Sequence, residues 1–426
     1  MTDAVADPIS SARGQAQLTT ADGIPLKTAL AIAQSKARRR AFLLVLPLLA
    51  FVLITFVAPI GQMLYRSVHN PAFSDNAPAL AVWFEANPTG TEPDEAAYEA
   101  LVSDLRAMRE NKTQGVAGTR INYDLAGSRS LFTSTARKSA KMEPPFKEAV
   151  LDADEDWADP QLWQVMRTAS SAYTANFYLA ALDRTRDENG NIVRVNENRR
   201  LYVGNFIKTM LLSALITGCC LVLGYPIAHL LATLPLRHSN LLMIFVLLPF
   251  WTSLLVRTTS WIVLLQSQGV VNDTLVAVGV VADESRIQMI YNQTGTIVAM
   301  VHILLPFMVL PLYSVMRPIN PSYVRAARSL GATSWTAFRR IYVPQTVPGM
   351  GAGGLLVFIL AVGYYITPAL VGGASGQLIS NFIAFHMQKS LNWSLAAALA
   401  ALLLACILLL YWLYDRLIGI DNLKLG

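Results

Sequence analysis

The fold of this 426-residue chain is decided by the stretch Arg325-Ala326-Ala327-Arg328-Ser329-Leu330-Gly331, which Ile341-Tyr342-Val343-Pro344 follows after nine further residues. The stretch is polar and contains good helix formers, so it favours a short helix that its glycine can end. It lies between two strongly apolar segments of the kind that cross membranes. A helix-forming loop with a fixed glycine, placed between two spans, is suited to being gripped by a soluble partner.

The composition is that of a membrane protein. The chain is 54% hydrophobic and only 15% charged, whereas soluble globular chains usually carry about 25% charged residues. Of its 28 acidic residues, 20 fall between Arg66 and Arg200, so the remainder is both apolar and basic. The net charge of +6 therefore fits basic cytoplasmic loops. No basic stripe is interleaved with aromatic residues, which argues against a nucleic-acid partner.

Residue chemistry argues against an enzyme. The three cysteines, Cys219, Cys220 and Cys406, all lie in apolar runs, which is typical of small buried side chains. The spacing of histidine, cysteine and acidic residues fits no metal site. The chain also has no phosphate-binding glycine-rich motif, nucleophile elbow or His-Glu-x-x-His motif. We therefore predict no catalytic residue, cofactor or metal in this chain.

Six segments are long and apolar enough to cross a membrane, which takes about 20 residues each. They are roughly residues 41–65, 206–233, 241–265, 294–316, 350–371 and 395–417. The third and fifth contain proline, glycine and polar residues, which are tolerated where a helix faces protein or a water-filled path. Arginines gather in the loops after the second and fourth segments, so these loops are expected in the cytoplasm, together with both termini.

This topology predicts a division of the chain into five parts. Residues 1–40 form a disordered cytoplasmic tail, 41–65 the first span, 66–200 an outer insert, 201–417 a membrane core and 418–426 a cytoplasmic tail. The insert is mostly helical, with helices over Glu95–Met108 and Pro160–Ala181 and a hairpin within residues 183–196. Residues 275–281, on the outer face between the third and fourth spans, form a short re-entrant or interfacial helix.

The loop over residues 318–348 is predicted to form a compact knob. Tyr323–Leu330 is a short helix that Gly331 ends in the left-handed conformation. Thr333 or Ser334 then caps a second short helix, which contains Trp335, Phe338 and Ile341. Such a knob has an apolar face and a basic rim, which suits a cleft on a soluble partner. The alternative is an ordinary helix–loop–helix without a partner.

The loop resembles the signature of bacterial ATP-binding-cassette (ABC) importer permeases: Glu-Ala-Ala, three residues, Gly, nine residues, Ile, one residue, Leu-Pro. Two positions depart from it, because Arg325 stands in place of the glutamate and Val343 in place of the leucine. Further stretches resemble the spermidine/putrescine-type permeases, and together with the loop they cover residues 41–65 and 201–417. These stretches are Gly224–Pro226, Pro249–Thr258, Leu305–Tyr313 and Gly363–Gly373.

The resemblance implies an all-α, six-helix permease of the type I ABC importers, in the bacterial inner membrane and surrounded by lipid. It implies a second, homologous permease, two ATPase subunits that hold ATP and magnesium, and a periplasmic solute-binding protein. This chain is then the moving subunit, which alternates between outward-facing and inward-facing states without hydrolysing ATP. The loop residues expected to couple it to the ATPases are Arg325, Ala326, Ala327, Gly331, Trp335, Phe338 and Pro344.

A second set of residues is predicted to line the translocation path. Its members are Trp251, Arg257, Tyr364, Tyr365 and Thr367. Arg257 either faces the path or the second permease, or it extends to the outer membrane surface. Trp251 and Trp261 line the path or anchor the spans at the interface, while His229 and His302 are expected to be packed within the bundle.

The solute is left open by one departure from the family. Tyr364 stands where polyamine permeases often carry a glutamate, and tyrosine offers only a ring and a hydroxyl to a cation. The solute is therefore a polyamine, another organic cation, an amino-acid derivative or an opine-like molecule.

Two other functions compete with the importer. A stand-alone secondary transporter or channel commonly carries intramembrane carboxylates for ion coupling, and the six segments contain a single acidic residue, Asp415, near the end of the last one. A membrane-anchored scaffold that presents the outer insert leaves the interrupted spans and the loop knob without a purpose. The importer is therefore the function that the sequence favours.

Overall fold

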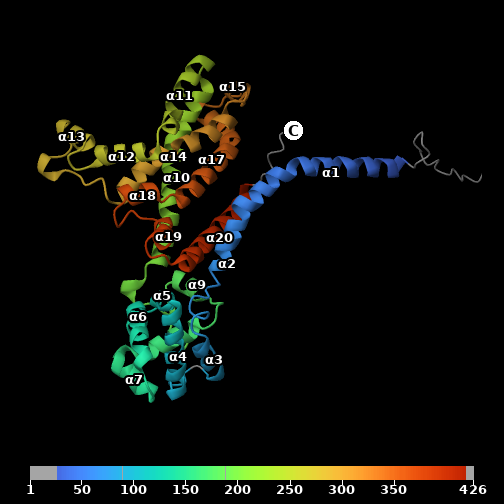
Figure 1. Ribbon diagram of the computed structural model, residues 1–426. Helices are drawn as coiled ribbons and strands as arrows, with labels where there is room; N and C mark the ends of the chain where they lie inside the picture. The colour runs from blue at the N-terminus through green and yellow to red at the C-terminus, as the bar shows by residue number, and fades with distance from the viewer. Residues whose placement is uncertain (1–25, 89, 188, 419–426) are drawn as a thin grey trace, which may run out of the picture. The chain divides into compact units, whose positions relative to one another are not determined.

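The computed structural model describes residues 26–88, 90–187 and 189–418 (Figure 1). The chain divides into two compact units, residues 1–63 and 64–426. In the first unit, α1 (Leu26–Val52) passes through a π-helical turn, η1 (Leu53–Val57), into α2 (Ala58–Arg66). The helix thus begins before the predicted span at 41–65, so residues 26–40 are helical and not part of a disordered tail. Residues 1–25 lie outside the described part.

The membrane core of the second unit contains long apolar helices joined by shorter ones. The long ones are α10 (Tyr202–Thr233), α14 (Gln293–Met316), α17 (Val343–Gly363) and α20 (Trp393–Ile418). Between them lie α11 (Leu236–Trp251), α12 (Leu254–Leu265), α13 (Val270–Ala277), η5 (Asp283–Ser285), α15 (Ser322–Ser329), α16 (Ser334–Ala337), η6 (Phe338–Tyr342), α18 (Ile366–Val371) and α19 (Ile379–Gln388).

The predicted count of six spans is confirmed for the described residues, with one span bent. Five continuous helices are long and apolar enough to cross a membrane, and α11 with the segment after it makes a sixth, bent by 96°. The predicted third span, 241–265, is therefore not one straight helix. Residues 252–253 break it, because Pro249 in the last turn of α11 weakens the hydrogen bonding there.

The predicted fifth span, 350–371, is displaced. The helix runs from Ser334 through η6 to Gly363, where the backbone of Tyr364 becomes extended and α18 starts separately. Two side chains of α19 satisfy the backbone at this break: Ser380 Oγ donates to the Tyr364 carbonyl (2.6 Å) and Asn381 Nδ2 to the Tyr365 carbonyl (2.8 Å). Non-helical backbone inside a membrane protein needs such partners.

Helices α10, α14 and α17 run side by side and bury the main core (Figure 1). Met308 of α14 lies at their centre, because both neighbours face it with glycine. A Cβ atom placed on Gly353 would lie 2.9 Å from Met308 Sδ, and one on Gly224 would lie 3.1 Å from Met308 Cγ. The glycine-rich start of α17 thus brings it against α14 of the same chain.

The insert has its own helical core. Its helices are α3 (Pro78–Ala86), α4 (Glu95–Asn111), α5 (Gln114–Asn122), α6 (Ser128–Lys138), α7 (Phe146–Ala153), α8 (Pro160–Ala169) and α9 (Asn176–Ala181), with 3-10 turns η2 (Ser139–Lys141), η3 (Glu155–Ala158) and η4 (Glu197–Arg199). The prediction of a helix at 95–108 is confirmed by α4, whereas the one at 160–181 is split into α8 and α9. Strands β1 (Arg184–Arg186) and β2 (Ile192–Arg194) pair antiparallel as the predicted hairpin.

Asp183 joins the insert to the core. It has a left-handed backbone (φ 54°), and its carboxylate accepts hydrogen bonds from three backbone N–H groups at the start of α10, at 2.8 to 3.0 Å. Unpaired N–H groups and the positive end of the helix dipole both favour an anion there. Tyr123 Oη also donates to the Leu391 carbonyl (3.0 Å), and Asn70 Nδ2 to Ser394 Oγ (3.0 Å).

Asp104 makes the stability of the insert depend on pH. Its carboxylate is buried and accepts from Ala79 N (3.1 Å) and Leu80 N (2.8 Å), yet burial raises its pKa to about 6. The folded state then holds this proton more tightly than the unfolded state. The resulting stability is present below about pH 4 and is lost as the pH rises through 6, by up to about 2 kcal/mol after solvent screening.

We expect the Asp104→Asn variant to lose this pH dependence. The measurement is urea unfolding of the full chain between pH 4 and 7.5, followed by limited proteolysis within the insert. Glu99→Gln is the matched control, because Glu99 is exposed on the same helix. A pH dependence that survives in Asp104→Asn would assign it to another group.

Candidate functional site

The first part of the candidate site is the knob, defined as residues 322–337. Helix α15 begins after Asn320, whose Oδ1 accepts from Ser322 N (2.9 Å). It ends at Gly331, which has a φ of +89°, and Thr333 Oγ1 then caps α16 by accepting from Thr336 N (3.2 Å). The predicted helix, glycine end and Thr333 cap are confirmed. The second helix, however, is not a separate short one, because α16 continues through η6 into α17.

The knob exposes apolar side chains. Leu330 is 90% exposed, Trp335 68% and Tyr323 55%. Arg325 and Ala326 are also exposed, as are the three arginines Arg328, Arg339 and Arg340. An exposed apolar patch with a polar rim is typical of a protein–protein contact. Of the other predicted coupling residues, Pro344 is exposed, while Ala327 and Phe338 are half-buried.

An aromatic ladder connects the knob to α10. Trp335 stacks on Phe338 (ring centroids 5.8 Å apart), and Phe338 stacks on Tyr342 (5.7 Å). His229 of α10 lies edge-on to Phe338 (5.6 Å) and Tyr342 (5.0 Å). Tyr225 adds a further ring contact with Phe338 at 6.3 Å. The packed position predicted for His229 is therefore confirmed.

Two features fix the ladder against the membrane core. Phe338 to Tyr342 form a π-helical turn, a geometry that is often found at functional sites. Arg317, just after α14, donates through Nη1 to the Ala232 carbonyl (2.7 Å) and the Leu234 carbonyl (3.0 Å) at the end of α10. Packed side chains and hydrogen bonds thus connect the segments on both sides of the knob to α10.

The second part of the candidate site is at the break between α17 and α18. Thr258 Oγ1 of α12 and Thr367 Oγ1 of α18 are both buried and lie 3.3 Å apart. Arg257 directly precedes Thr258 on α12, which places it close to the start of α18. Arg257 Nε is buried and has no hydrogen-bond partner among the described residues. The structure thus places Arg257, Tyr364 and Thr367 in one region.

Among the described residues, no hydrogen bond or ring contact joins Trp251 to this region. It ends α11 at the bend and is 71% exposed. Tyr365 is 38% exposed, and its carbonyl, not its ring, makes the described contact with Asn381. Trp261 donates through Nε1 to His302 Nδ1 (3.1 Å), which keeps His302 packed as predicted.

Sequence reasoning missed four contributors to these regions. They are Tyr342, Tyr225, Ser380 and Asn381. Only Tyr342 carries a signal in the sequence, because Trp335, Phe338 and Tyr342 are spaced three and four residues apart and so share one helix face. Tyr225 lies in Gly224–Pro226, which carries the family resemblance but says nothing of its contact with Phe338. Ser380 and Asn381 act across large sequence separations, so no local pattern marks them.

Comparisons with known proteins agree with these observations. Residues 209–418 match the family described as "Binding-protein-dependent transport system inner membrane component". The spermidine/putrescine transport system permease protein PotB of Salmonella typhimurium (strain SL1344) is 36% identical over 222 residues, which make up 51% of this chain and 77% of that protein. PotB of Escherichia coli (strain K12) is 36% identical over 222 residues, 51% of this chain and 80% of that protein.

Among solved structures, a bacterial ABC transporter involved in the import of the acidic polysaccharide alginate is similar. It is 22% identical with a TM-score of 0.40, and the match covers 50% of this chain and 80% of that chain. Identity of 36% over more than three quarters of the length of the permeases is decisive on its own. This chain belongs to the inner-membrane permease subunits of ABC importers, in the spermidine/putrescine-type family.

Proposed function

We propose that this permease subunit carries a small amino-acid derivative with a free carboxylate across the inner membrane, driven by ATPases that grip the knob. The exposure of Leu330 and Trp335 on the knob carries the mechanical part of the proposal. Burying these side chains in a cleft of a partner removes apolar surface from water. The aromatic ladder then passes the movement of the partner to α10 and α17.

The complete importer contains four further components in this proposal. A second, homologous permease lines the other half of the path, two ATPases bind ATP and magnesium, and a periplasmic binding protein delivers the solute. Both termini of this chain lie in the cytoplasm with the 318–348 loop, and residues 66–200 lie outside. Arg325 carries a positive charge where the family has a glutamate, so its partner on the ATPase is an acidic residue.

The positive charge of Arg257 near Tyr364 carries the choice of cargo. A cation in the wall of a low-dielectric path attracts a carboxylate and repels a dication such as putrescine. An amino-acid derivative or opine-like solute therefore suits this wall better than a polyamine or another organic cation. A polyamine is the second candidate, because the relatives are named as spermidine/putrescine permeases and because Arg257 itself lies in Pro249–Thr258, one of the stretches that resemble those permeases.

Two measurements test this function. Gentle purification from the native membrane, followed by mass spectrometry, is expected to recover a second permease and two copies of an ATPase. A stable chain without any ATPase would favour a secondary transporter or channel instead. Uptake of labelled 4-aminobutanoate and putrescine then tests the cargo, since both have four carbons and differ in one carboxylate. Faster uptake of putrescine would assign the polyamine.

The ladder makes a separate prediction. The Phe338→Ala change removes the ring that contacts Trp335, Tyr342 and His229, so movement of the knob no longer reaches α10. We expect uptake to fall at least tenfold in proteoliposomes while ATP hydrolysis continues. Phe245→Ala is the control, because Phe245 is 63% exposed on α11. Coupled uptake in Phe338→Ala would remove the ladder from the mechanism.

A further inference from the structure

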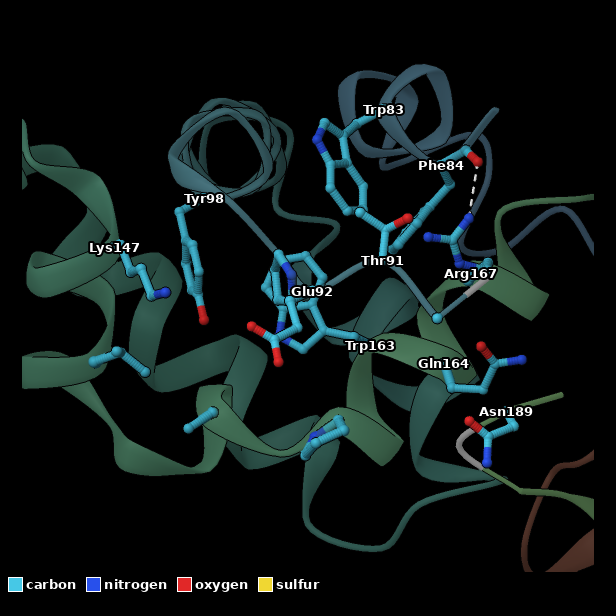
Figure 2. A pocket seen from close by; sticks show the side chains of 15 residues that line it. Trp83, Phe84, Thr91, Glu92, Tyr98, Lys147, Trp163, Gln164, Arg167 and Asn189 are labelled. Carbon is cyan, nitrogen blue, oxygen red and sulfur yellow. Dashed lines mark hydrogen bonds between the residues drawn. The ribbon is translucent and has the colours of Figure 1, made fainter. Parts of the chain in front are cut away.

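The insert contains a pocket that the transport mechanism does not use. It has a volume of about 420 Å³, within the range of small-molecule sites. Its lining comes from α3, the segment after α3, α4, α7, α8 and the turn of the hairpin (Figure 2). These elements are distant in sequence, so the pocket is formed by the packing of the whole insert.

The floor of the pocket is aromatic and its polar ring atoms are already satisfied. Trp83 Nε1 donates to Asp94 Oδ1 (3.0 Å), and Trp163 Nε1 donates to the Trp157 carbonyl (2.8 Å). Trp163 contacts both Trp83 (6.2 Å between ring centroids) and Tyr98 (5.1 Å) edge to face. The rings therefore offer the pocket apolar surface that is fixed in place.

Arg167 brings an unpaired positive charge to this floor. Its guanidinium carbon lies 4.8 Å from the Phe84 ring and 5.7 Å from the Trp83 ring, and its Nη1 donates to the carbonyls of Phe84 (2.9 Å) and Asn87 (2.6 Å). Within the described ranges it has no carboxylate partner. Its Nε and Nη2 make no hydrogen bond to a described residue, and neither is sealed from solvent.

This arrangement favours a carboxylate. An arginine whose orientation is fixed offers two parallel N–H donors that match the two oxygens of a carboxylate. Burial lowers the pKa of Arg167 because its charge is partly desolvated, and an anion in the pocket would compensate that desolvation. The aromatic floor beside it can hold an apolar group of the same ligand.

Two more charged side chains line the pocket. Lys147 and Glu92 are both exposed, and neither forms an ion pair with a residue of the described part of the chain. Figure 2 shows Lys147 beside Tyr98, Arg167 on the opposite side of the view and the Glu92 carboxylate between them. The pocket thus offers two cations and one anion around an apolar floor.

We propose that this pocket binds a free amino acid or a close derivative, with its carboxylate at Arg167, its ammonium group at Glu92 and its apolar side chain on the aromatic floor. A dication would meet two positive charges and one negative charge, and a simple carboxylate would leave Glu92 without a partner. The site is separate from the path at Arg257. It therefore stands whether or not the cargo proposed above is correct.

Calorimetric titration of the purified full chain in detergent tests the site with three matched probes. L-phenylalanine carries both charges, phenethylamine lacks the carboxylate and 3-phenylpropanoate lacks the ammonium group. We expect saturable binding of L-phenylalanine and at least tenfold weaker binding of each analogue, since each leaves one charge unpaired. Binding of 3-phenylpropanoate as tight as that of L-phenylalanine, or no saturable binding of L-phenylalanine, would overturn the proposal.

Variants separate this pocket from the path. Glu92→Gln and Lys147→Gln change exposed side chains, so the fold is retained. Glu92→Gln is expected to weaken L-phenylalanine binding at least tenfold, and Lys147→Gln, on the opposite side of the pocket from Arg167, is expected to weaken it less. Glu143→Gln and Lys141→Gln are the controls, because both residues are exposed and lie outside the lining. Binding that is lost in Arg257→Gln but kept in Glu92→Gln and Lys147→Gln would place the ligand in the path and overturn the site.

Discussion

Replacing Gly331 with proline is expected to reduce uptake to background while the chain stays in the membrane. Gly331 has a φ of +89°, and proline is restricted to about −65°. Proline also removes the N–H that donates to the Arg328 carbonyl (3.0 Å). A Cβ at this position would meet nothing within 4 Å, so the effect comes from the backbone. The knob then changes shape while the rest of the chain packs as before.

The Gly331→Asn variant is the matched control for this result. Asparagine tolerates the left-handed conformation better than other residues with a side chain, so uptake should stay within about twofold of the wild type. Gly331→Ala should lie between the two, because alanine bears a cost of about 1 kcal/mol there. Uptake by membrane vesicles and co-purification of the ATPase are measured together. Normal uptake in Gly331→Pro would show that the knob does not couple transport to ATP.

The shape of the knob was predictable because its chemistry is local. A run of helix formers from Tyr323, a glycine at 331 and a hydroxyl at 333 specify a helix, its end and the next cap without help from the rest of the chain. The structure adds what lies beyond the local pattern. The helix after Thr333 continues into α17, because η6 packs against His229, about a hundred residues earlier in the chain.

The ends of the spans were harder to predict than their number. Composition gives six apolar segments, but it does not say where an apolar helix stops. Gly363 ends α17 because Ser380 and Asn381 hold the two carbonyls that follow, and those donors are provided by a later helix. Residues 364–371 are apolar enough to look like a continuation, so only the tertiary contact separates α18 from α17.

The insert illustrates the same limit. Helix α4 was predicted because its apolar residues recur at helical spacing around a single buried face. The pocket beside it was not predicted, since its lining joins residues between 83 and 189 that no spacing connects. Clusters of this kind depend on packing among several elements, whereas the repeat of one helix is present in its own sequence.

The second large effect is expected at Arg257. Replacing it with glutamine removes the positive charge beside the break between α17 and α18, and uptake of 4-aminobutanoate should fall at least tenfold, or about 1.4 kcal/mol. Arg257→Lys keeps the charge and should retain most of the uptake. Lys208→Gln is the control, because it also removes one positive charge, from α10. Lys208 Nζ donates to the Ser375 carbonyl (3.2 Å). The measurement is initial uptake into membrane vesicles at saturating binding protein.

Charge reversal separates the two positions that Arg257 can occupy. If it lines the path, Arg257→Glu should shift the ratio of 4-aminobutanoate to putrescine uptake toward putrescine, because the field in the wall changes sign. If it extends to the outer membrane surface, the charge is screened by water and salt. The uptake ratio should then be the same in the wild type, Arg257→Gln and Arg257→Glu. The buried, unpartnered Nε of Arg257 favours the first result. A guanidinium at the membrane surface would instead donate all of its N–H groups to water.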